Sequence, residues 1–388
     1  MIKDIIILGS TGSIGQSTLN VITKDKLKFR IKLLTTNKNI KKIYNQAIDF
    51  NVKKVVVNDK KKFGRFAEIF KKKKIKVFFT LDDALKNNKK KVYFTVSAIS
   101  GLNGLYPTIK IIKYTKNLGL ANKESIICGW KFLEKELKKY NTKFIPLDSE
   151  HFSIWKLLKH EDKKNIKKIY LTASGGPFLN KKLNDIKNIK PKYALKHPNW
   201  VMGKKISIDS ATMMNKIFEV IEAKKIFNLS MDKFEILIHP KSYIHAIVHF
   251  KTGLTKFLAH DTTMEIPIAN SLHETNNIFL HNEDEFLYSK LNGINFINPK
   301  LKNFPLLKIL KSDFNNTYYE IILVSINDAL VRLYLNNDIS YITIHNLMLK
   351  LLKKPYFTKY YNICPRNLND IKNMVKKVDQ YLKLYLVK

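Results

Sequence analysis

The chain has 388 residues, more than one ordinary hydrophobic core can organise, so we expect two or three domains. It holds no run of about 18 apolar residues and only two cysteines, which excludes a membrane span and a disulfide framework and fits a reducing, cytosolic setting. The net charge of +38 suggests nucleic-acid binding, but all except four of the 70 basic residues are lysines, whereas arginine makes the bidentate contacts of specific recognition, so we favour a solvated lysine exterior.

Residues 5–8 form the first apolar run, and because it starts so close to Met1 we expect no signal or transit peptide. A glycine-rich turn and a helix over residues 13–23 follow it. Further strands are predicted at residues 31–35, 55–57, 92–97 and 125–128. This alternation of strands and helices predicts a parallel sheet with helices on both faces.

Gly9, Gly12 and Gly15 lie in the turn between the first strand and the first helix. Their spacing lets the backbone approach a pyrophosphate at the start of the helix, and it favours a dinucleotide site over an ordinary tight turn. The second strand ends at residues 35–39 without the Asp or Glu that would bond the ribose of NAD. The missing acid, and to a lesser extent Lys38, favour NADPH.

An acid pair, Asp148 and Glu150, follows the apolar residues 144–147. In an extended segment both carboxylates would lie on one side, roughly 7 Å apart. Together with Glu219 they could supply oxygen ligands for Mg²⁺ or Mn²⁺, and the alternative is a surface acid pair or a helix cap. Several histidines of the same central region strengthen the case for a polar site: His151, His197, His239 and His245.

Strands are next predicted at residues 168–172, 234–239 and 246–250, and helices dominate beyond about Asn298. Ser174 and the two glycines after it follow the first of these strands. They form a candidate anion-binding turn, because such a turn exposes backbone N–H groups.

Residues 197–219 are the most unusual stretch of the chain, with His, Trp, Met, Gly, Ser, Asn, Lys and Glu side by side. Ser210 is predicted to cap a helix that ends near Phe227. One face of that helix, close to its N-terminus, carries Asn215, Lys216 and Glu219. Free N–H groups at such an end attract an anion, so a phosphate and a metal could both bind there. The alternative is a solvated helix face with one ion pair.

Together these motifs resemble the 1-deoxy-D-xylulose 5-phosphate reductoisomerases of the non-mevalonate isoprenoid pathway. The resemblance runs over nearly the whole chain, and its most specific segments are residues 9–15, 121–125, 147–151, 174–178, 197–222 and 238–245. It implies an α/β fold assembled as a cytoplasmic homodimer. The implied parts are a Rossmann-like NADPH-binding domain at residues 1–147, an α+β catalytic and dimerisation domain with a lid loop at 148–297, and a C-terminal helical domain at 298–388.

The resemblance also implies roles for individual residues. Contacts with NADPH would come from Thr11, Gly12, Ser13, Ile14, Asn37, Lys38, Asn39, Asn122, Glu124 and Gly203. Ligands of Mg²⁺, Mn²⁺ or a similar ion such as Co²⁺ would be Asp148, Glu150 and Glu219. The substrate would be held by Lys123, Ser149, Glu150, Ser174, His197, Trp200, Ser210, Asn215, Lys216 and Glu219. Catalysis would rest on Lys123, Glu150, His197 and Glu219, with Trp200 and Met202 in the lid.

The implied reaction rearranges 1-deoxy-D-xylulose 5-phosphate and reduces the resulting aldehyde with NADPH to 2-C-methyl-D-erythritol 4-phosphate. A retro-aldol/aldol route and an alkyl shift both fit the same residues. Two other classes of protein stay open. One is a plain NADP-dependent dehydrogenase for another phosphorylated substrate, which needs no divalent ion. The other is a non-catalytic polyanion-binding protein that uses the positive charge.

Residues 262–268 depart from the family pattern. The family usually has Pro-Asp-Met-Arg before a Pro-Ile pair, and here Glu265 stands where the arginine would be. A negative charge replaces a positive one, so we expect any salt bridge made by that arginine to be absent, with an effect on local stability or dimer packing.

Overall fold

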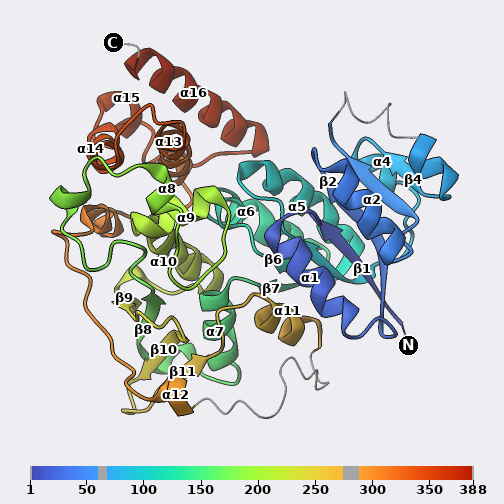
Figure 1. Ribbon diagram of the computed structural model, residues 1–388, viewed down its shortest axis with the longest axis horizontal. Helices are drawn as coiled ribbons and strands as arrows, with labels where there is room; N and C mark the ends of the chain where they lie inside the picture. Colours follow the sequence, from blue (N-terminus) through green and yellow to red (C-terminus); the bar gives the residue numbers. More distant parts are fainter. Residues whose placement is uncertain (1, 60–67, 274–287, 387–388) are drawn as a thin grey trace. The chain divides into compact units, whose positions relative to one another are not determined.

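The first part of the chain alternates strands and helices as predicted (Figure 1). The computed structural model describes residues 2–59, 68–273 and 288–386. Seven strands, all parallel, form one sheet in the order β4-β3-β2-β1-β5-β6-β7. Their bounds are β1 Lys3–Leu8, β2 Phe29–Thr36, β3 Lys54–Val57, β4 Lys76–Phe78, β5 Val92–Ser97, β6 Thr115–Leu120 and β7 Lys143–Pro146. The predicted strands at 5–8, 31–35, 55–57 and 92–97 are confirmed.

The connecting helices determine where a ligand can approach this sheet. They are α1 Ser13–Thr23, α2 Ile40–Asp49, α4 Leu81–Leu85, α5 Leu105–Ile111 and α6 Lys123–Lys139. Crossover connections are right-handed, so α1 and α2, which step from β1 toward β3, and α5, which steps the other way, cover opposite faces. The direction of stepping reverses between β1 and β5. Ligands of open α/β sheets bind at the carboxyl ends of the strands that flank such a switch point.

One predicted strand is wrong. Residues 125–128 belong to α6, whose N-cap is Asn122. Ile126 and Ile127 are fully buried on that helix. A buried strand and a turn of a buried helix can carry the same short apolar run, so the run alone does not distinguish them.

A second sheet has four strands in the order β11-β10-β8-β9. Strand β10 is antiparallel to β8 and β11, and β8 is parallel to β9. The bounds are β8 Ile166–Ala173, β9 Phe234–Ile238, β10 Ile244–Phe250 and β11 Thr255–Ala259. Three of these strands confirm predictions, and β11 was not predicted.

Helices supply most of the remaining structure, and they dominate beyond Asn298 as predicted. The buried helix α10 packs against β8 and β9, while α13 contacts α9, α14 and α16. The bounds are α7 Ser149–Leu157, α8 Pro191–Ala194, α9 Lys204–Ala211, α10 Met214–Phe227, α11 Glu265–Leu272, α12 Tyr288–Leu291, α13 Tyr318–Leu335, α14 Tyr341–Leu351, α15 Pro355–Thr358 and α16 Leu368–Leu386.

The chain forms two compact units. The first holds the seven-stranded sheet and α11, and it takes in Met1–Ser125, Lys131–Phe152 and Met264–Asn282. The second holds the four-stranded sheet and the C-terminal helices, and it takes in Ile126–Trp130, Ser153–Thr263 and Glu283–Lys388. The three domain ranges expected from the sequence stay predictions. Across residues 2–59, 68–273 and 288–386, no helix combines the length and apolar character of a membrane span.

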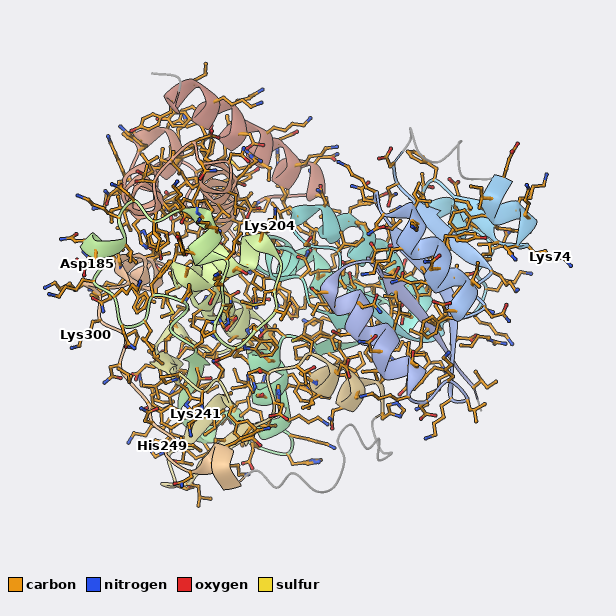
Figure 2. All side chains as sticks on the ribbon, in the orientation of Figure 1. Lys74, Asp185, Lys204, Lys241, His249 and Lys300 are labelled. Carbon is orange, nitrogen blue, oxygen red and sulfur yellow. The ribbon has the colours of Figure 1, made fainter. Side chains whose placement is uncertain are left out.

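Lysines cover the surface, as the composition suggests. Figure 2 labels Lys74, Lys204, Lys241 and Lys300 among the side chains, and all four are exposed. Within the described ranges the buried lysines are Lys123, Lys216 and Lys225. Each of them contacts a carboxylate, which a buried ammonium requires. Two of the three are residues that the sequence singled out as candidate substrate contacts.

Glu265, the departure from the family pattern, has its own partners. Asn20 donates a 3.0 Å hydrogen bond to this carboxylate, and the Lys24 ammonium lies 3.2 Å from it. Both partners belong to α1, against which α11 packs. Glu265 therefore makes an ion pair of its own, in which it is the anion and Lys24 the cation. Because both side chains are partly exposed, we expect it to stabilise the chain by less than about 1 kcal/mol.

We predict that stability falls as the pH drops from about 6.5 toward 4. Burial lowers the pKa of His345 to about 4, and burial likewise lowers the pKa of His273 to about 4 and of His260 to about 3. These rings stay neutral in the folded protein, whereas in the unfolded chain they take up protons below about pH 6.5. A falling pH therefore favours the unfolded chain and lowers the free energy of unfolding. Each adds up to about 1.4 kcal/mol per pH unit to the slope. Urea unfolding at several pH values measures that slope, and we expect His345→Gln to reduce it.

Candidate active site

The glycine turn after β1 has the conformation that a dinucleotide requires. Gly9 adopts φ +80°, which disfavours other residues, and its N–H bonds the Thr35 hydroxyl at 2.8 Å. At Gly15 a Cβ atom would stand 2.5 Å from the Gly9 carbonyl oxygen, so the start of α1 packs directly on the turn. The N-cap of α1, Gly12, offers no side-chain hydrogen bond, and the first turn carries no acid. The helix N-terminus thus remains available for a phosphate.

The end of β2 lies beside this turn. Thr11 and Thr36 share a hydrogen bond of 2.8 Å between their hydroxyls. No acid stands at the strand end, and Asn39 caps α2 by accepting a 3.3 Å hydrogen bond from the Lys42 N–H. Asn37 and Lys38 precede that cap. This arrangement lacks the carboxylate that bonds the 2′-hydroxyl in NAD enzymes, and it suits the 2′-phosphate of NADPH.

The start of α6 brings two predicted site residues next to each other. Asn122 caps the helix and also donates a 2.7 Å hydrogen bond to the Gly101 carbonyl. Its side chain therefore has a structural role in addition to any contact with NADPH. Lys123 forms an ion pair with Asp148. Glu124 lies in the first turn, where a negative charge complements the helix dipole.

Asp148 and Glu150 are not in an extended segment, and this part of the prediction is wrong. Strand β7 ends at Pro146 and α7 begins at Ser149. Asp148 Oδ1 accepts hydrogen bonds from the N–H groups of Glu150 (3.2 Å) and His151 (3.4 Å), so it caps the helix, as the alternative foresaw. Glu150 and Ser149, whose side chains are hydrogen-bonded, form the first turn.

The protonation state of Asp148 follows from its neighbours. Burial alone would raise its pKa, but the Lys123 ammonium and His151 outweigh burial and hold the pKa well below its ordinary value. His151 Nδ1 lies 3.2 Å from the carboxylate. Asp148 is therefore an anion at neutral pH, as a metal ligand has to be.

Ser210 does not begin a helix, which corrects the second structural prediction for this region. It lies in the last turn of α9, and α10 begins only at Met214 after Met213, which has φ +65°. The left-handed residue breaks the run into two helices, and no glycine or proline in the sequence signals it. The predicted end at Phe227 is confirmed.

The polar face of α10 is confirmed. Asn215 Nδ2 donates a 2.6 Å hydrogen bond to Glu219, and the Lys216 ammonium forms an ion pair with the same carboxylate. Lys216 and Glu219 are buried, so the pair is not a solvated surface contact. Asn215 and Lys216 lie in the first turn of a helix whose N-cap makes no side-chain hydrogen bond. An ammonium and a side-chain amide thus meet at the start of one helix.

Ser174 and His197 extend this polar group. His197 Nδ1 accepts from the N–H groups of Asn199 (3.1 Å) and Trp200 (3.0 Å), so the neutral ring carries its proton on Nε2. That N–H points at the Ser174 hydroxyl oxygen, 3.0 Å away. Burial, with a smaller effect of the Lys216 ammonium, lowers the pKa of His197 to about 4. The ring is a neutral donor at physiological pH.

The Ser174 hydroxyl can act as a donor itself. Its oxygen already accepts from His197 and from the Gly176 N–H at 3.0 Å, which leaves its own proton to donate. Gly176 has φ +69°, and a Cβ there would lie 3.0 Å from the Ser210 carbonyl oxygen. The turn after β8 therefore packs on the end of α9, and it brings Ser174 and Ser210 into one neighbourhood.

The loop of residues 197–203 holds the predicted lid side chains. The Trp200 ring packs edge-on against His245, with 6.1 Å between ring centres. Asn199, which the sequence analysis did not single out, donates 2.7 Å hydrogen bonds to the Pro240 carbonyl and the Ser242 hydroxyl. Val201 is fully exposed, and Gly203 faces open space. The loop is thus anchored at its first residues and open toward its end.

The carboxylates fit a hard divalent cation. Asp148 and Glu150 of the first unit and Glu219 of the second could each offer one carboxylate oxygen to a metal ion. Oxygen-only ligands of this kind suit Mg²⁺ or Mn²⁺ rather than soft metals. Fold and site together thus define a class of protein, a dinucleotide-dependent oxidoreductase with a carboxylate metal site.

Comparisons with known proteins identify the family. A family model of 1-deoxy-D-xylulose 5-phosphate reductoisomerase matches residues 5–129, and two models of its C-terminal domains match residues 144–227 and 260–381. A reductoisomerase of that name from Pelagibacter ubique is 52% identical over 381 residues, 96% of each chain. Another from Wolbachia pipientis wMel is 37% identical over 376 residues, 96% of this chain and 95% of the relative.

Solved structures agree with these relatives. The Zymomonas mobilis reductoisomerase in complex with NADPH has a TM-score of 0.89 at 29% identity, over 100% of this chain and 99% of that one. A reductoisomerase bound to NADPH, fosmidomycin and magnesium has a TM-score of 0.90 at 30% identity, over 99% and 98% of the two chains. The chain belongs to the 1-deoxy-D-xylulose 5-phosphate reductoisomerase family and is an NADP-dependent oxidoreductase.

Proposed function

We propose that this chain converts 1-deoxy-D-xylulose 5-phosphate to 2-C-methyl-D-erythritol 4-phosphate with NADPH and a divalent metal, in isoprenoid precursor synthesis. The observation that carries the proposal is the polar face of α10, where Lys216 and Asn215 share the buried carboxylate of Glu219. Family membership and the glycine turn after β1 agree with it. When bound, NADPH supplies the hydride and the cation supplies charge that polarises the ketone.

The metal ligands proposed are Asp148, Glu150 and Glu219. Each carboxylate now has a hydrogen-bond donor beside it: Lys123 at Asp148, Ser149 at Glu150 and Lys216 at Glu219. A cation that takes up the carboxylate charge leaves these donors to the substrate. Lys123 and Ser149 then face its hydroxyl and carbonyl oxygens, and Lys123 can stabilise an oxygen that loses its proton.

The phosphate of the substrate is proposed to bind between the turn after β8 and the start of α10. The donors are the Ser174 hydroxyl, the Ser210 hydroxyl, the Asn215 amide and the Lys216 ammonium, the last two in the first turn of α10. His197 supports this set, because its Nε2–H directs the Ser174 hydroxyl proton outward. Phosphate binding at a rigid, buried helix provides remote binding energy for closing the loop.

The loop 197–203 is proposed to cover the carbon skeleton. Trp200 and Met202 would exclude water, which protects the aldehyde from hydration before reduction. The NADPH site is proposed to use the N–H groups of the glycine turn for the pyrophosphate, the loop after β2 for the 2′-phosphate, and the start of α6 for the nicotinamide end. The residues concerned are Thr11, Gly12, Ser13, Ile14, Asn37, Lys38, Asn39, Asn122, Glu124 and Gly203.

NADPH oxidation at 340 nm tests the proposal. We expect consumption that requires both 1-deoxy-D-xylulose 5-phosphate and Mg²⁺ or Mn²⁺, and that stops with EDTA. Oxidation insensitive to EDTA would favour a plain dehydrogenase. No NADPH binding, together with salt-sensitive binding of nucleic acid, would favour a polyanion-binding protein.

Lys216→Ala should chiefly weaken substrate binding. The ammonium is a proposed phosphate ligand, so we expect the KM for the substrate to rise at least about tenfold while kcat falls less. The KM for NADPH should stay unchanged, which steady-state kinetics with each substrate varied in turn will measure. Lys383→Ala, which removes an exposed ammonium from the last turn of α16, is the matched control. A loss confined to kcat would contradict a simple phosphate anchor.

We also propose that the chain acts as a homodimer in the cytoplasm. Light scattering after size-exclusion chromatography measures the mass of the assembly. A mass of one chain of 45.3 kDa at micromolar concentration would exclude the dimer.

A further inference from the structure

Lys225 is a buried lysine without a task in the proposed reaction. Of the three buried lysines in the described ranges, Lys123 and Lys216 belong to the proposed substrate site, and Lys225 does not. In a chain so rich in exposed lysines, burying this ammonium has to be offset by something specific, because a buried charge without partners is strongly unfavourable.

The partners of Lys225 come from the C-terminal helices. Its ammonium lies 3.0 Å from Glu320, whose side chain is fully buried, and it donates a 2.6 Å hydrogen bond to the Asn316 side chain. Glu320 also accepts from the N–H groups of Asn316 (2.7 Å) and Thr317 (2.9 Å), which completes a capping box at the start of α13. Within this network the Lys225 ammonium connects the end of α10 to the start of α13.

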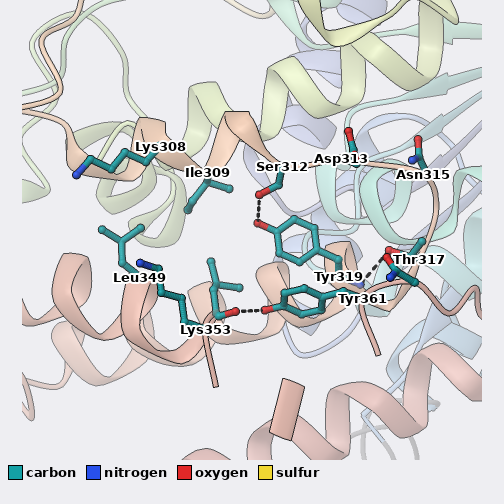
Figure 3. A pocket seen from close by; sticks show the side chains of 12 residues that line it. Lys308, Ile309, Ser312, Asp313, Asn315, Thr317, Tyr319, Leu349, Lys353 and Tyr361 are labelled. Atoms are coloured by element: carbon teal, nitrogen blue, oxygen red, sulfur yellow. Dashed lines mark hydrogen bonds between the residues drawn. The ribbon is translucent and has the colours of Figure 1, made fainter. Parts of the chain in front are cut away.

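The neighbouring lysine strengthens the same connection. Lys224 donates a 2.6 Å hydrogen bond to the Phe314 carbonyl and a 3.0 Å hydrogen bond to Asn315. Figure 3 shows the segment 312–317 along a cavity of about 470 Å³, where the Tyr319 hydroxyl bonds Ser312 at 3.0 Å. Tyr319 thus fixes the start of this segment, and the Phe314 carbonyl and Asn315 side chain accept hydrogen bonds from α10.

The network is remote from the proposed phosphate site but lies on the same helix. Lys225 follows Lys216 by nine residues, roughly 14 Å along the axis, so it cannot touch the substrate phosphate. Helix α10 is buried nearly all round, and apolar packing alone sets the rotation and axial position of such a helix only loosely. A buried ion pair with defined geometry can fix both.

A second contact from α13 reaches the other helix of the site. Asn327 donates a 2.8 Å hydrogen bond to the buried carboxylate of Asp209, the residue before Ser210. Lys205 pairs with Asp209 at 2.8 Å and with Asp328 of α13 at 3.1 Å. Helix α13 therefore holds both α9 and α10, which carry the proposed phosphate donors.

We infer that Glu320 is a positioning residue that sets the phosphate-binding start of α10 through Lys225. The inference rests on the proposed function, since it assigns α10 to the substrate phosphate. It gives the C-terminal helices a part in substrate affinity, although none of their side chains is proposed to contact the substrate.

Glu320→Gln tests the inference, because it keeps the shape and one of the two cap-accepting oxygens but removes the charge that pairs with Lys225. We expect the KM for the phosphorylated substrate to rise about tenfold, with the KM for NADPH unchanged and kcat within about threefold. Asn316→Gly is the second variant. It removes one of the two acceptors of Lys225 and leaves Glu320, and glycine tolerates the φ of +60° at that position. We expect a smaller rise in the same KM, about threefold.

Asp379→Asn serves as the matched control. It also removes one negative charge, from an exposed pair between Arg332 and Asp379 at 3.2 Å, and should change neither KM. Variants that lose thermal stability but keep the wild-type KM for the substrate would overturn the inference, and so would equal rises in both KM values. If Glu320→Gln does not fold, Asn316→Gly alone decides. An inactive wild-type enzyme would instead refute the proposed function.

Discussion

Glu219→Gln is expected to lower kcat by at least about 1,000-fold while NADPH binds with unchanged affinity. The side chain is buried and accepts from both Asn215 and Lys216, so the carboxylate lies within the donor set proposed for the substrate. Glutamine keeps the shape but removes one of the three charges that would hold the cation. It also leaves the Lys216 ammonium buried without its counter-charge, which costs about 3–5 kcal/mol of folding free energy in comparable pairs.

Stability and metal binding therefore have to be measured beside turnover. Mg²⁺ should raise the Tm of the wild-type protein by mass action and leave the Tm of Glu219→Gln unchanged. Glu235→Gln is the control, because it makes the same substitution in a half-exposed pair with Lys168 at 2.6 Å. We expect its kcat to stay within about twofold of the wild type. Near-normal turnover of Glu219→Gln with Mg²⁺ would show that the metal assignment is wrong.

Local sequence patterns predicted most of the central strands of both sheets. The helix at residues 13–23 and the strand at 92–97 agree with the structure at both ends, because buried strands and an amphipathic helix leave a clear apolar period. The strands β4, β6, β7 and β11 were not predicted. Three of them, β4, β7 and β11, are edge strands, where exposed positions interrupt the apolar pattern on which such a prediction depends. Strand β6 lies inside its sheet, but polar residues and a glycine interrupt its apolar run.

The candidate site was predictable in its residues but not in its local geometry. The spacing of Asn215, Lys216 and Glu219 placed them on one helix face, and the structure confirms their contacts. The break at Met213 was not foreseen, because a left-handed methionine depends on the packing around it and not on its own preference. Lys225 was not foreseen for a similar reason: its partner Glu320 is far away in sequence, and in a lysine-rich chain nothing local distinguishes it.

Gly15→Ala is expected to remove NADPH binding and to destabilise the first unit. The added methyl carbon would lie 2.5 Å from both the Gly9 oxygen and the Ser10 Cα, and neither backbone atom can move aside as a side chain can. The turn would have to open against the bonds that Gly9 and Ser10 make to Thr35, at 2.8 and 3.0 Å. We expect the Kd for NADPH to rise at least about 100-fold, or about 2.7 kcal/mol, and the Tm to fall.

Gly12→Ala distinguishes an effect on NADPH binding from an effect on the stability of the fold. Its methyl carbon would meet only the Gly9 oxygen, at 3.5 Å, so the turn can keep its shape and the Tm of the free protein should not change. Gly12 is the N-cap of α1, where the pyrophosphate is proposed to bind. The added methyl group should therefore lower the affinity for NADPH by direct contact with the nucleotide. Calorimetric titration with NADPH and thermal melts without it distinguish the two variants. Normal NADPH affinity in both would exclude the glycine turn as the pyrophosphate site, whereas a lower Tm for Gly12→Ala would mean that the turn is tighter than the distances indicate.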